Sequence, residues 1–259
     1  RLAGLFWPEM SEAQARHNLS QCLHILRQAL DGTIQTDDLA WRPGRAQPFI
    51  FVTSHTVQFN PSSDTCLDVR EFEIRIAAAR QHAHRCLETC GQCARLLQEA
   101  EQLYQDDFLT GISLPGCYAF EEWVLVWRER LRRQLCQALA DLVVYSEGRN
   151  ELRKTLDLAE RWVHVDPLNE TAQRCLMRLL ALDGQRTQAL ARYTSFSKIL
   201  ATELGVAPSR ESQQLYQRIL AEESAQRAFK HGWIRQDAQY PYAHETHWFE
   251  SEGMRIVWQ

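Results

Sequence analysis

The stretch DPLNETAQRCLMRLLALDGQRTQALARYTSFSKILATELGVAP, residues 166–208, predicts two helices joined by a tight turn. Asp166 and Pro167 favour a helix start, because an N-cap carboxylate accepts unpaired amide hydrogens and proline fits the first helical position. Gly184 favours the stop, since glycine adopts the left-handed C-cap conformation at little cost. Both helices carry an apolar stripe to bury, made of Ala172, Leu176, Leu179, Leu180, Ala189, Leu190, Tyr193, Phe196, Leu200 and Leu204.

A similar helix pair precedes this one, over residues 134–167. The turn glycines Gly148 and Gly184, and the stripe residues Leu156 and Leu190, recur at a spacing close to the tetratricopeptide period of about 34 residues. One helix pair cannot cover its own apolar face, so neighbouring pairs stack into a continuous core with a concave surface that usually binds protein. The pattern therefore predicts a helical repeat domain.

These strings, above all DPLNE, LMRLLALDGQRTQALARY and LATELGVAPS, with DDFLTG at 106–111, resemble the bacterial transcriptional activation domain. That domain is a tetratricopeptide-like unit that accompanies a winged helix in SARP-class bacterial transcription regulators. The resemblance covers about residues 1–222 and is strongest over 120–220. It implies a mainly α fold: a partial winged helix-turn-helix with a β-hairpin wing, then a tetratricopeptide-like right-handed helical repeat domain.

Four segments follow from this reading. Residues 1–60 are the partial winged-helix DNA-binding domain, 61–67 the linker, 68–222 the helical activation domain, and 223–259 an aromatic-rich tail of unknown structure. Asp68 and Glu71 predict a capping-box start for the helical domain. Because Arg1 enters a helix at once, we treat the chain as a fragment of a longer protein.

The amino-terminal segment has the order of a helix-turn-helix with a wing. Ser11 and Gln14 form a capping box that opens a helix to about Leu30, and the strands 49–53 and 56–59 meet at a turn formed by Ser54 and His55. The resemblance is to the second and third helices and the wing of a response-regulator winged helix, with the first helix absent. In such folds the long helix enters the major groove.

One face of this long helix is polar and is predicted to contact DNA through Arg16, His17, Ser20, Gln21, His24 and Arg27. Amides and guanidinium groups read base edges or hold phosphates. The opposite face is predicted to be buried through Ala15, Leu19, Cys22, Leu23, Leu26 and Leu30. Any amphipathic surface helix has a polar face, and the net charge of −4 provides no general attraction for nucleic acid. The alternative is an interaction scaffold that does not bind DNA.

The segment HAHRCLETCGQC, residues 82–93, combines histidines with a Cys-x-x-Cys pair. Structural zinc takes four nitrogen or thiolate ligands in a tetrahedron, so we predict a zinc site formed by His82, His84, Cys90 and Cys93. The alternatives are chance clustering, with the cysteines buried as small apolar residues, and a metal-responsive regulatory module.

The remaining sequence indicates a regulator and not an enzyme. It has no phosphate loop, nucleophile elbow or dinucleotide fingerprint, and His244 and His247 are one residue short of the zinc-hydrolase spacing. No membrane span or signal peptide is predicted, so we expect a cytoplasmic protein. The implied partners are double-stranded promoter DNA, RNA polymerase or a second protomer in a homodimer, and a sensor or ATPase domain of the longer protein.

Overall fold

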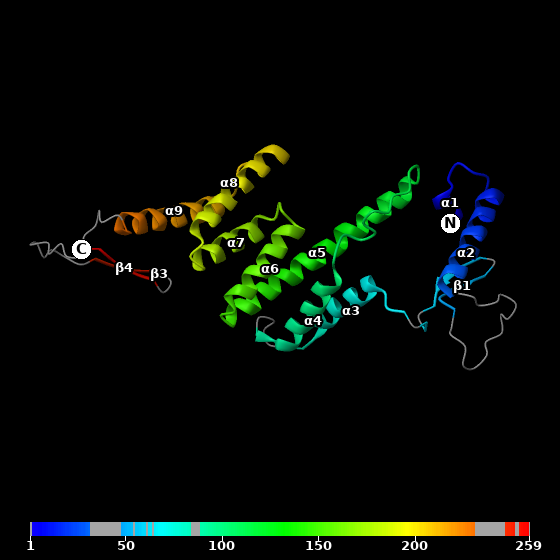
Figure 1. Ribbon diagram of the computed structural model, residues 1–259, viewed down its shortest axis with the longest axis horizontal. Coiled ribbons are helices and arrows are strands. Elements are labelled where there is room, and N and C mark those ends of the chain that lie inside the picture. Colours follow the sequence, from blue (N-terminus) through cyan, green and yellow to red (C-terminus); the bar gives the residue numbers. More distant parts are fainter. Residues whose placement is uncertain are drawn as a thin grey trace, which may run out of the picture.

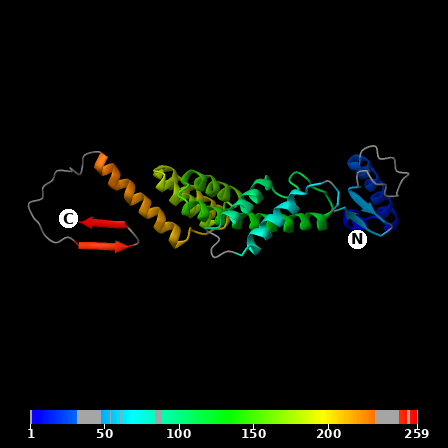
Figure 2. The same cartoon turned by 90° about the horizontal axis from the view of Figure 1, so that it is seen from below.

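The computed structural model describes residues 2–31, 48–53, 55–60, 62–63, 65–83, 89–230, 247–251 and 254–258. Figures 1 and 2 show an elongated molecule, with the amino-terminal helices and first hairpin at one end and a stack of helices in the middle. The predicted fold class is confirmed: the chain is mainly helical, with a small two-stranded hairpin between the first helices and the stack.

The amino-terminal part contains α1 (Leu2–Phe6), α2 (Glu12–Asp31), β1 (Ile50–Val52) and β2 (Val57–Phe59). The strands pair in antiparallel fashion, with Val52 opposite Val57, as the predicted turn requires. The N-cap of α2 at Ser11 is confirmed, but the reciprocal half of the predicted capping box is replaced by a contact between the two side chains. Ser11 Oγ accepts a hydrogen bond from the Gln14 amide at 3.4 Å and donates one to Gln14 Oε1 at 2.9 Å.

The buried face predicted for α2 is only partly buried. Ala15 is buried and Leu19 and Leu23 are half-buried, but Cys22, Leu26 and Leu30 are exposed, so the prediction was wrong for these three. Within the described residues, α1 is the helix that packs against α2. A helix of five residues covers only the beginning of a helix of twenty, which leaves the second half of the apolar face in solvent.

The helical repeat domain consists of α3 (Asp68–Gln81), α4 (Gly91–Leu103), α5 (Tyr118–Gly148), α6 (Leu152–Val165), α7 (Glu170–Leu182), α8 (Arg186–Glu203) and α9 (Arg210–Lys230). The helices α3 and α4, α5 and α6, and α7 and α8 pack as pairs, and each pair packs on the next. One core runs through all three pairs, and its most buried members include Leu135, Leu139, Leu142, Ala159 and Leu176.

The turn of the 166–208 stretch has the predicted form. Gly184 has φ +81°, and the Gln185 amide donates to the Leu180 carbonyl at 2.8 Å, which satisfies the end of α7. The predicted N-cap was wrong. Asn169 caps α7, because its Oδ1 accepts from the Ala172 amide at 3.1 Å, while Asp166 lies in the preceding turn and accepts from the Asn169 side chain.

Two large apolar residues of the repeat domain are exposed, and one of them, Leu204, was predicted to lie in a buried stripe. Leu204 lies at the end of α8 and is largely exposed. Trp123 is 44% exposed, because the first half of α5 projects beyond α3 and α4 toward the amino-terminal helices (Figure 1). The helical periodicity at both positions is real, but no neighbouring helix in the described part of the chain reaches far enough to cover them.

The carboxyl-terminal part departs from the prediction as well. The last helix, α9, continues to Lys230 where the sequence predicted an end near Glu222, since Ala221 to Ala228 contains good helix formers and no glycine or proline. The tail contains β3 (His247–Ser251) and β4 (Met254–Trp258), paired as an antiparallel hairpin. Among the described residues, no helix is both long and apolar enough to cross a membrane.

Candidate nucleic-acid interface and candidate metal cluster

The residues predicted to contact DNA form one ridge on α2. Five of the six side chains are exposed and Arg27 is half-buried. Neither the described hairpin nor the helical repeat domain covers this ridge, which lies at the end of the molecule (Figure 1). The helical spacing of His17, Gln21 and His24, at i, i+4 and i+7, places the three side chains one above another. We call this surface, made of Arg16, His17, Ser20, Gln21, His24 and Arg27, the α2 ridge.

Two local contacts order the side chains of the α2 ridge. Arg16 Nη2 lies 2.6 Å from Glu12 Oε1, one helical turn earlier, and the Arg16 side chain is 66% exposed. Gln21 Nε2 lies 2.9 Å from His17 Nε2, as a hydrogen bond. Exposed pairs of this kind contribute at most about 1 kcal/mol, so both side chains can exchange their partner for a stronger one.

The hairpin beside α2 is closed by hydrogen bonds between its two threonines. The Thr53 amide donates to the Thr56 carbonyl at 2.8 Å, and the Thr56 amide donates to Thr53 Oγ1 at 3.0 Å. His55 is exposed at the tip, while its predicted turn partner Ser54 lies outside the described residues.

The helix α1 docks the amino-terminal part on the beginning of α5, a contact that the sequence did not predict. Leu5 and Phe6 pack against a small apolar cluster of Cys117, Phe120 and Val124. The Phe6 and Phe120 rings are 6.1 Å apart, and the Cys117 thiol donates to the Leu5 carbonyl. Since α1 also packs on α2, this contact helps to fix the direction in which the α2 ridge faces. The only signal in the sequence was the unassigned apolar character of Leu2, Leu5 and Phe6.

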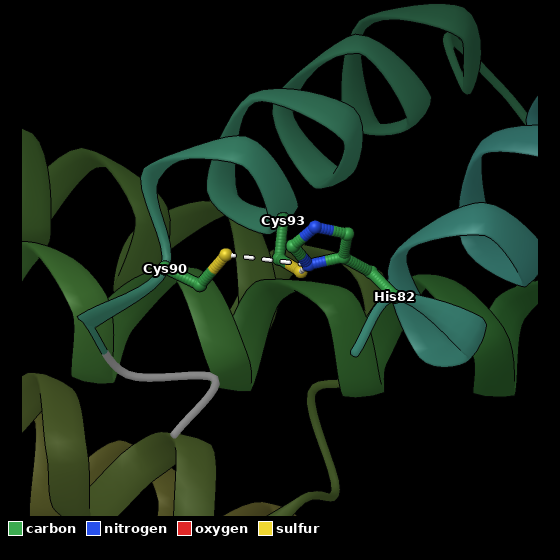
Figure 3. Close-up of side chains that lie close together, drawn as sticks. All are labelled: His82, Cys90 and Cys93. Carbon is green, nitrogen blue, oxygen red and sulfur yellow. Dashed lines mark hydrogen bonds between the residues drawn. The ribbon is translucent and has the colours of Figure 1, made fainter. Parts of the chain in front are cut away.

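Three of the four residues predicted to hold zinc lie together (Figure 3). His82 follows the end of α3, and Cys90 and Cys93 lie at the start of α4. His82 Nδ1 is 3.5 Å from Cys90 Sγ and 3.3 Å from Cys93 Sγ, and all three ligand atoms lie within 4.8 Å of one another. The fourth predicted ligand, His84, lies outside the described residues.

The two thiols of this cluster have different environments. The pKa of Cys90 is lowered, chiefly because the Cys93 amide at the first turn of α4 donates a hydrogen bond to its sulfur. Burial raises the pKa of Cys93 to about 11, with a further contribution from Cys90. Cys93 is fully buried, whereas His82 and Cys90 are half-buried. The amide groups at the start of α4 therefore favour a thiolate at Cys90.

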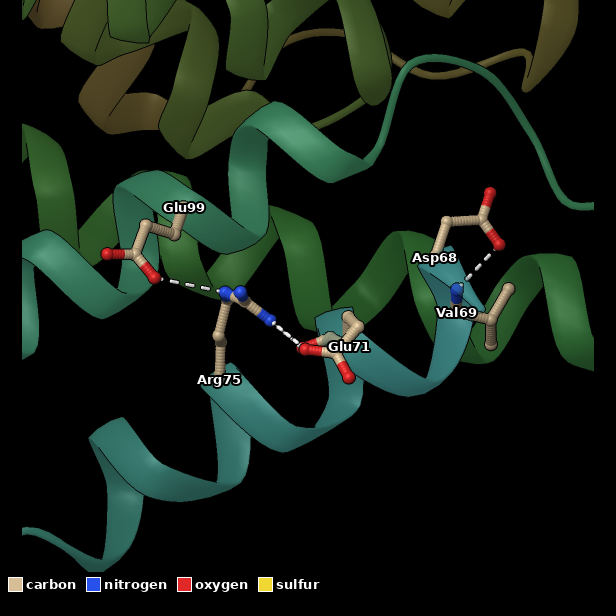
Figure 4. A network of polar contacts seen from close by, with 5 residues as sticks. All are labelled: Asp68, Val69, Glu71, Arg75 and Glu99. Carbon is tan, nitrogen blue, oxygen red and sulfur yellow. Dashed lines mark hydrogen bonds and ion pairs between the residues drawn. The ribbon is translucent and has the colours of Figure 1, made fainter. Parts of the chain in front are cut away.

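A polar network holds the middle of α3 against α4 (Figure 4). Arg75 donates to the Glu71 carboxylate on its own helix and, through Nε, to Glu99 Oε2 on α4 at 3.0 Å. The predicted capping box of Asp68 and Glu71 was wrong. Asp68 accepts only from the adjacent Val69 amide, and the Glu71 carboxylate is paired with Arg75.

Comparison with known proteins identifies the family of this chain. Residues 67–220 match the bacterial transcriptional activator domain. The regulatory protein AfsR of Streptomyces coelicolor is 32% identical over 152 residues, which cover 58% of this chain and 14% of that protein. AfsR of Streptomyces griseus is 32% identical over 155 residues, again 14% of its length. The chain thus spans about a seventh of these relatives.

A solved structure supports the same fold. The structure of Mycobacterium tuberculosis EmbR in complex with a low affinity phosphopeptide matches 85% of this chain and 54% of its own, with a TM-score of 0.55 and 18% identity. At this identity the match shows the fold alone. The domain match over residues 67–220, more than half of the chain, shows that the chain belongs to the bacterial transcriptional activator domain family.

Proposed function

We propose that this regulator binds double-stranded promoter DNA in the bacterial cytoplasm through the α2 ridge and acts as an activator. The observation that carries the proposal is the exposure of the ridge. If the hairpin or the repeat domain covered it, α2 would be a scaffold element, but Arg16, His17, Ser20, Gln21 and His24 are all exposed. No catalytic step is part of the proposal.

In this proposal α2 lies in the major groove, and the hairpin contacts the adjacent backbone. Gln21 and His17 read base edges, since an amide makes paired hydrogen bonds with adenine. Arg16 and Arg27, on one flank of the ridge, hold phosphates. A base-edge contact contributes about 1–3 kcal/mol, more than the exposed contacts that these side chains make within α2, so the exchange of partners favours the complex.

Phosphate contacts alone give this protein modest affinity. Counterion release scales with the number of neutralised phosphates, and the ridge offers only two arginines in a chain with a net charge of −4. Two protomers on neighbouring half-sites would double the number of contacts. We therefore propose that the helical repeat domain mediates protein contacts, of which the first is with a second copy of the chain.

The first half of α5 favours such a contact. Leu125 and Val126 are each 62% exposed and Tyr118 is 85% exposed. They share one face of α5 with Glu122, Glu129 and Arg133, which are also exposed. Glu122 precedes Leu125 and Val126, and Arg133 follows them, where it is ion-paired with Glu129 of its own helix at 3.1 Å. In an antiparallel pair of these faces that brings Glu122 of each copy near Arg133 of the other, the two residues attract each other across the contact.

The DNA-binding role is tested by selection of bound sequences from a random pool of duplex DNA, using the full chain. We expect enrichment of one sequence motif, and binding to that motif that weakens as salt increases. Recovery of a random set of sequences, or no retention of DNA at low salt, would leave the scaffold alternative as the better account of the α2 ridge.

A further inference from the structure

We propose that His82, Cys90 and Cys93 bind a structural zinc ion that joins the end of α3 to the start of α4. This site is separate from the α2 ridge and from the proposed DNA contact. Thiolates and an imidazole are the donors that zinc prefers, whereas magnesium and calcium take oxygen ligands. The class of ligand is therefore a borderline-soft divalent cation.

The distances between the donor atoms fit a tetrahedral zinc site. Zinc lies about 2.3 Å from a thiolate sulfur and about 2.0–2.1 Å from an imidazole nitrogen. At a tetrahedral angle, these bond lengths place sulfur and nitrogen about 3.5 Å apart. The separations between His82 Nδ1 and the two sulfurs are 3.5 and 3.3 Å. Both separations therefore match an ion bound by His82 Nδ1 and the two sulfurs, and all three atoms lie within 4.8 Å of one another.

A hydrogen-bonded cluster explains this arrangement less well than an ion does. Both thiols approach the same atom, His82 Nδ1 (Figure 3). One ring nitrogen has either a single hydrogen or a single lone pair in the plane of the ring, so it makes one good hydrogen bond and not two. The Cys93 thiol can instead donate to the Ala79 carbonyl at 3.5 Å, but that hydrogen bond does not account for its 3.3 Å approach to His82 Nδ1. A metal ion at the centre of the three donors satisfies all of them at once.

The position of the cysteines in α4 suits thiolate ligands. The spacing Cys-x-x-Cys at a helix start places both sulfurs on the same side of the first turn. Cys93 is buried beside the Ala79 carbonyl of α3, 3.5 Å away. A buried sulfur between two helices suits a structural site, and the described residues leave its fourth tetrahedral position for a further ligand.

The proposed ion would hold the end of α3 against the start of α4. The helix α3 is at the edge of the stack and packs mainly against α4. Arg75 fixes the middle of this pair through Glu99, and the cluster fixes the end at which the chain leaves α3 and enters α4. Because ligands of this kind come together only in the folded state, the free energy of metal binding stabilises the fold.

The test is the metal content of the full chain, purified under reducing conditions and measured by elemental analysis. We expect one zinc per chain, lost or strongly reduced in Cys90→Ser and Cys93→Ser. Cys66→Ser, which removes an exposed thiol outside the cluster, is the matched control and should keep the ion. His84→Ala tests the sequence prediction of a fourth ligand in the same assay.

A second measurement keeps the proposal testable if a variant fails to fold. Cobalt added to metal-free, folded wild-type chain should produce a thiolate-to-cobalt charge-transfer band, and zinc should abolish it. Purification without zinc, together with the lack of this band, would overturn the proposal. So would a Cys90–Cys93 disulfide in the freshly purified chain, or a melting temperature that is identical with and without zinc. None of these outcomes depends on DNA binding.

Discussion

Arg178 and Glu147 form a two-pronged ion pair between α7 and the end of α5. Arg178 Nη1 lies 2.6 Å from Glu147 Oε1, and Nη2 lies 2.8 Å from Oε2. The hydrogen bond with Glu147 raises the pKa of Arg178 above its ordinary value. The pair joins one helical repeat to the next. Its two parallel hydrogen bonds fix the relative orientation of the helices more specifically than apolar packing does.

We predict that Arg178→Lys lowers the free energy of unfolding by up to about 1 kcal/mol, because lysine cannot form the planar, paired contact and the site is partly exposed. Urea unfolding followed by circular dichroism measures the change. Arg95→Lys, at an exposed position of α4, is the matched control. Equal stability of the two variants would show that the pair contributes nothing measurable.

Glu170 joins the start of α7 to the start of α9, and this contact should depend on pH. Its carboxylate accepts the Ser209 amide. Partial burial acts to raise the pKa of Glu170, but hydrogen bonds from Ser209 and Ser212 outweigh it, and the net pKa is lowered. A lowered pKa in the folded state means that the contribution is present above the unfolded value of about 4.3 and is lost as pH falls through the folded value.

We therefore predict that Glu170→Gln destabilises the protein by roughly 1 kcal/mol at neutral pH, since a charge-assisted hydrogen bond becomes a neutral one. The difference between wild type and variant should shrink as pH falls below about 4.3, where the unfolded wild-type carboxylate takes up its proton before the folded one does. Denaturant unfolding at a series of pH values measures it. Glu203→Gln, at an exposed position of α8, should show no such trend, and a constant difference for Glu170→Gln would contradict the assignment.

For DNA binding, we predict that Gln21→Ala and Arg16→Ala each weaken binding to the selected sequence without a change in melting temperature. Loss of a base-edge contact at Gln21 should cost about 1–3 kcal/mol, or roughly tenfold in affinity. Loss of a phosphate contact at Arg16 should weaken all sequences alike and reduce the slope of the salt dependence by about one.

The controls for this series are chemically matched. Gln217→Ala in α9 and Arg95→Ala in α4 remove the same side chains from exposed positions of the repeat domain. Fluorescence anisotropy with the selected duplex compares all four variants. If the ridge variants bind as tightly as these controls, DNA does not contact α2.

Local signals account for the parts of the fold that the sequence predicted. Gly184 has φ +81°, a conformation that glycine adopts at little cost, so the end of α7 could be predicted from the residue type alone. The same reasoning missed detail at the end of α5, where the residue with positive φ is Asn150 and not Gly148. Asparagine tolerates this conformation almost as well, so composition alone cannot rank the two. The N-cap at Asn169 was missed for a similar reason, since Asp166 is an equally good capping residue.

The residues whose burial was predicted wrongly have a different explanation. Whether Trp123 or Leu26 is covered depends on which element packs there, and periodicity in one helix contains no information on its neighbours. The cluster of His82, Cys90 and Cys93 was predicted because its ligands are close in sequence. The docking of Phe6 on Phe120 was not, because the two residues meet only through the tertiary fold.

The proposed contact between two copies of α5 leads to the last prediction. Leu125→Glu or Val126→Glu should abolish self-association of the full chain, measured by sedimentation velocity, because a buried apolar contact is replaced by an unpaired charge. Leu182→Glu changes a leucine of similar exposure at the end of α7 and should leave self-association unchanged. A chain that is monomeric at all concentrations would contradict the contact outright.

The charges at the two ends of this face provide a sharper test of its antiparallel arrangement. In the antiparallel register that brings Glu122 of one copy near Arg133 of the other, Glu122→Arg places like charges together and should weaken the dimer. Adding Arg133→Glu in the same chain restores opposite charges at both ends and should restore the dimer. A simple surface effect of charge predicts no such rescue, since the double variant would carry two separate defects. Rescue therefore distinguishes a specific pairing of the two α5 helices from nonspecific association through the exposed side chains of Leu125 and Val126.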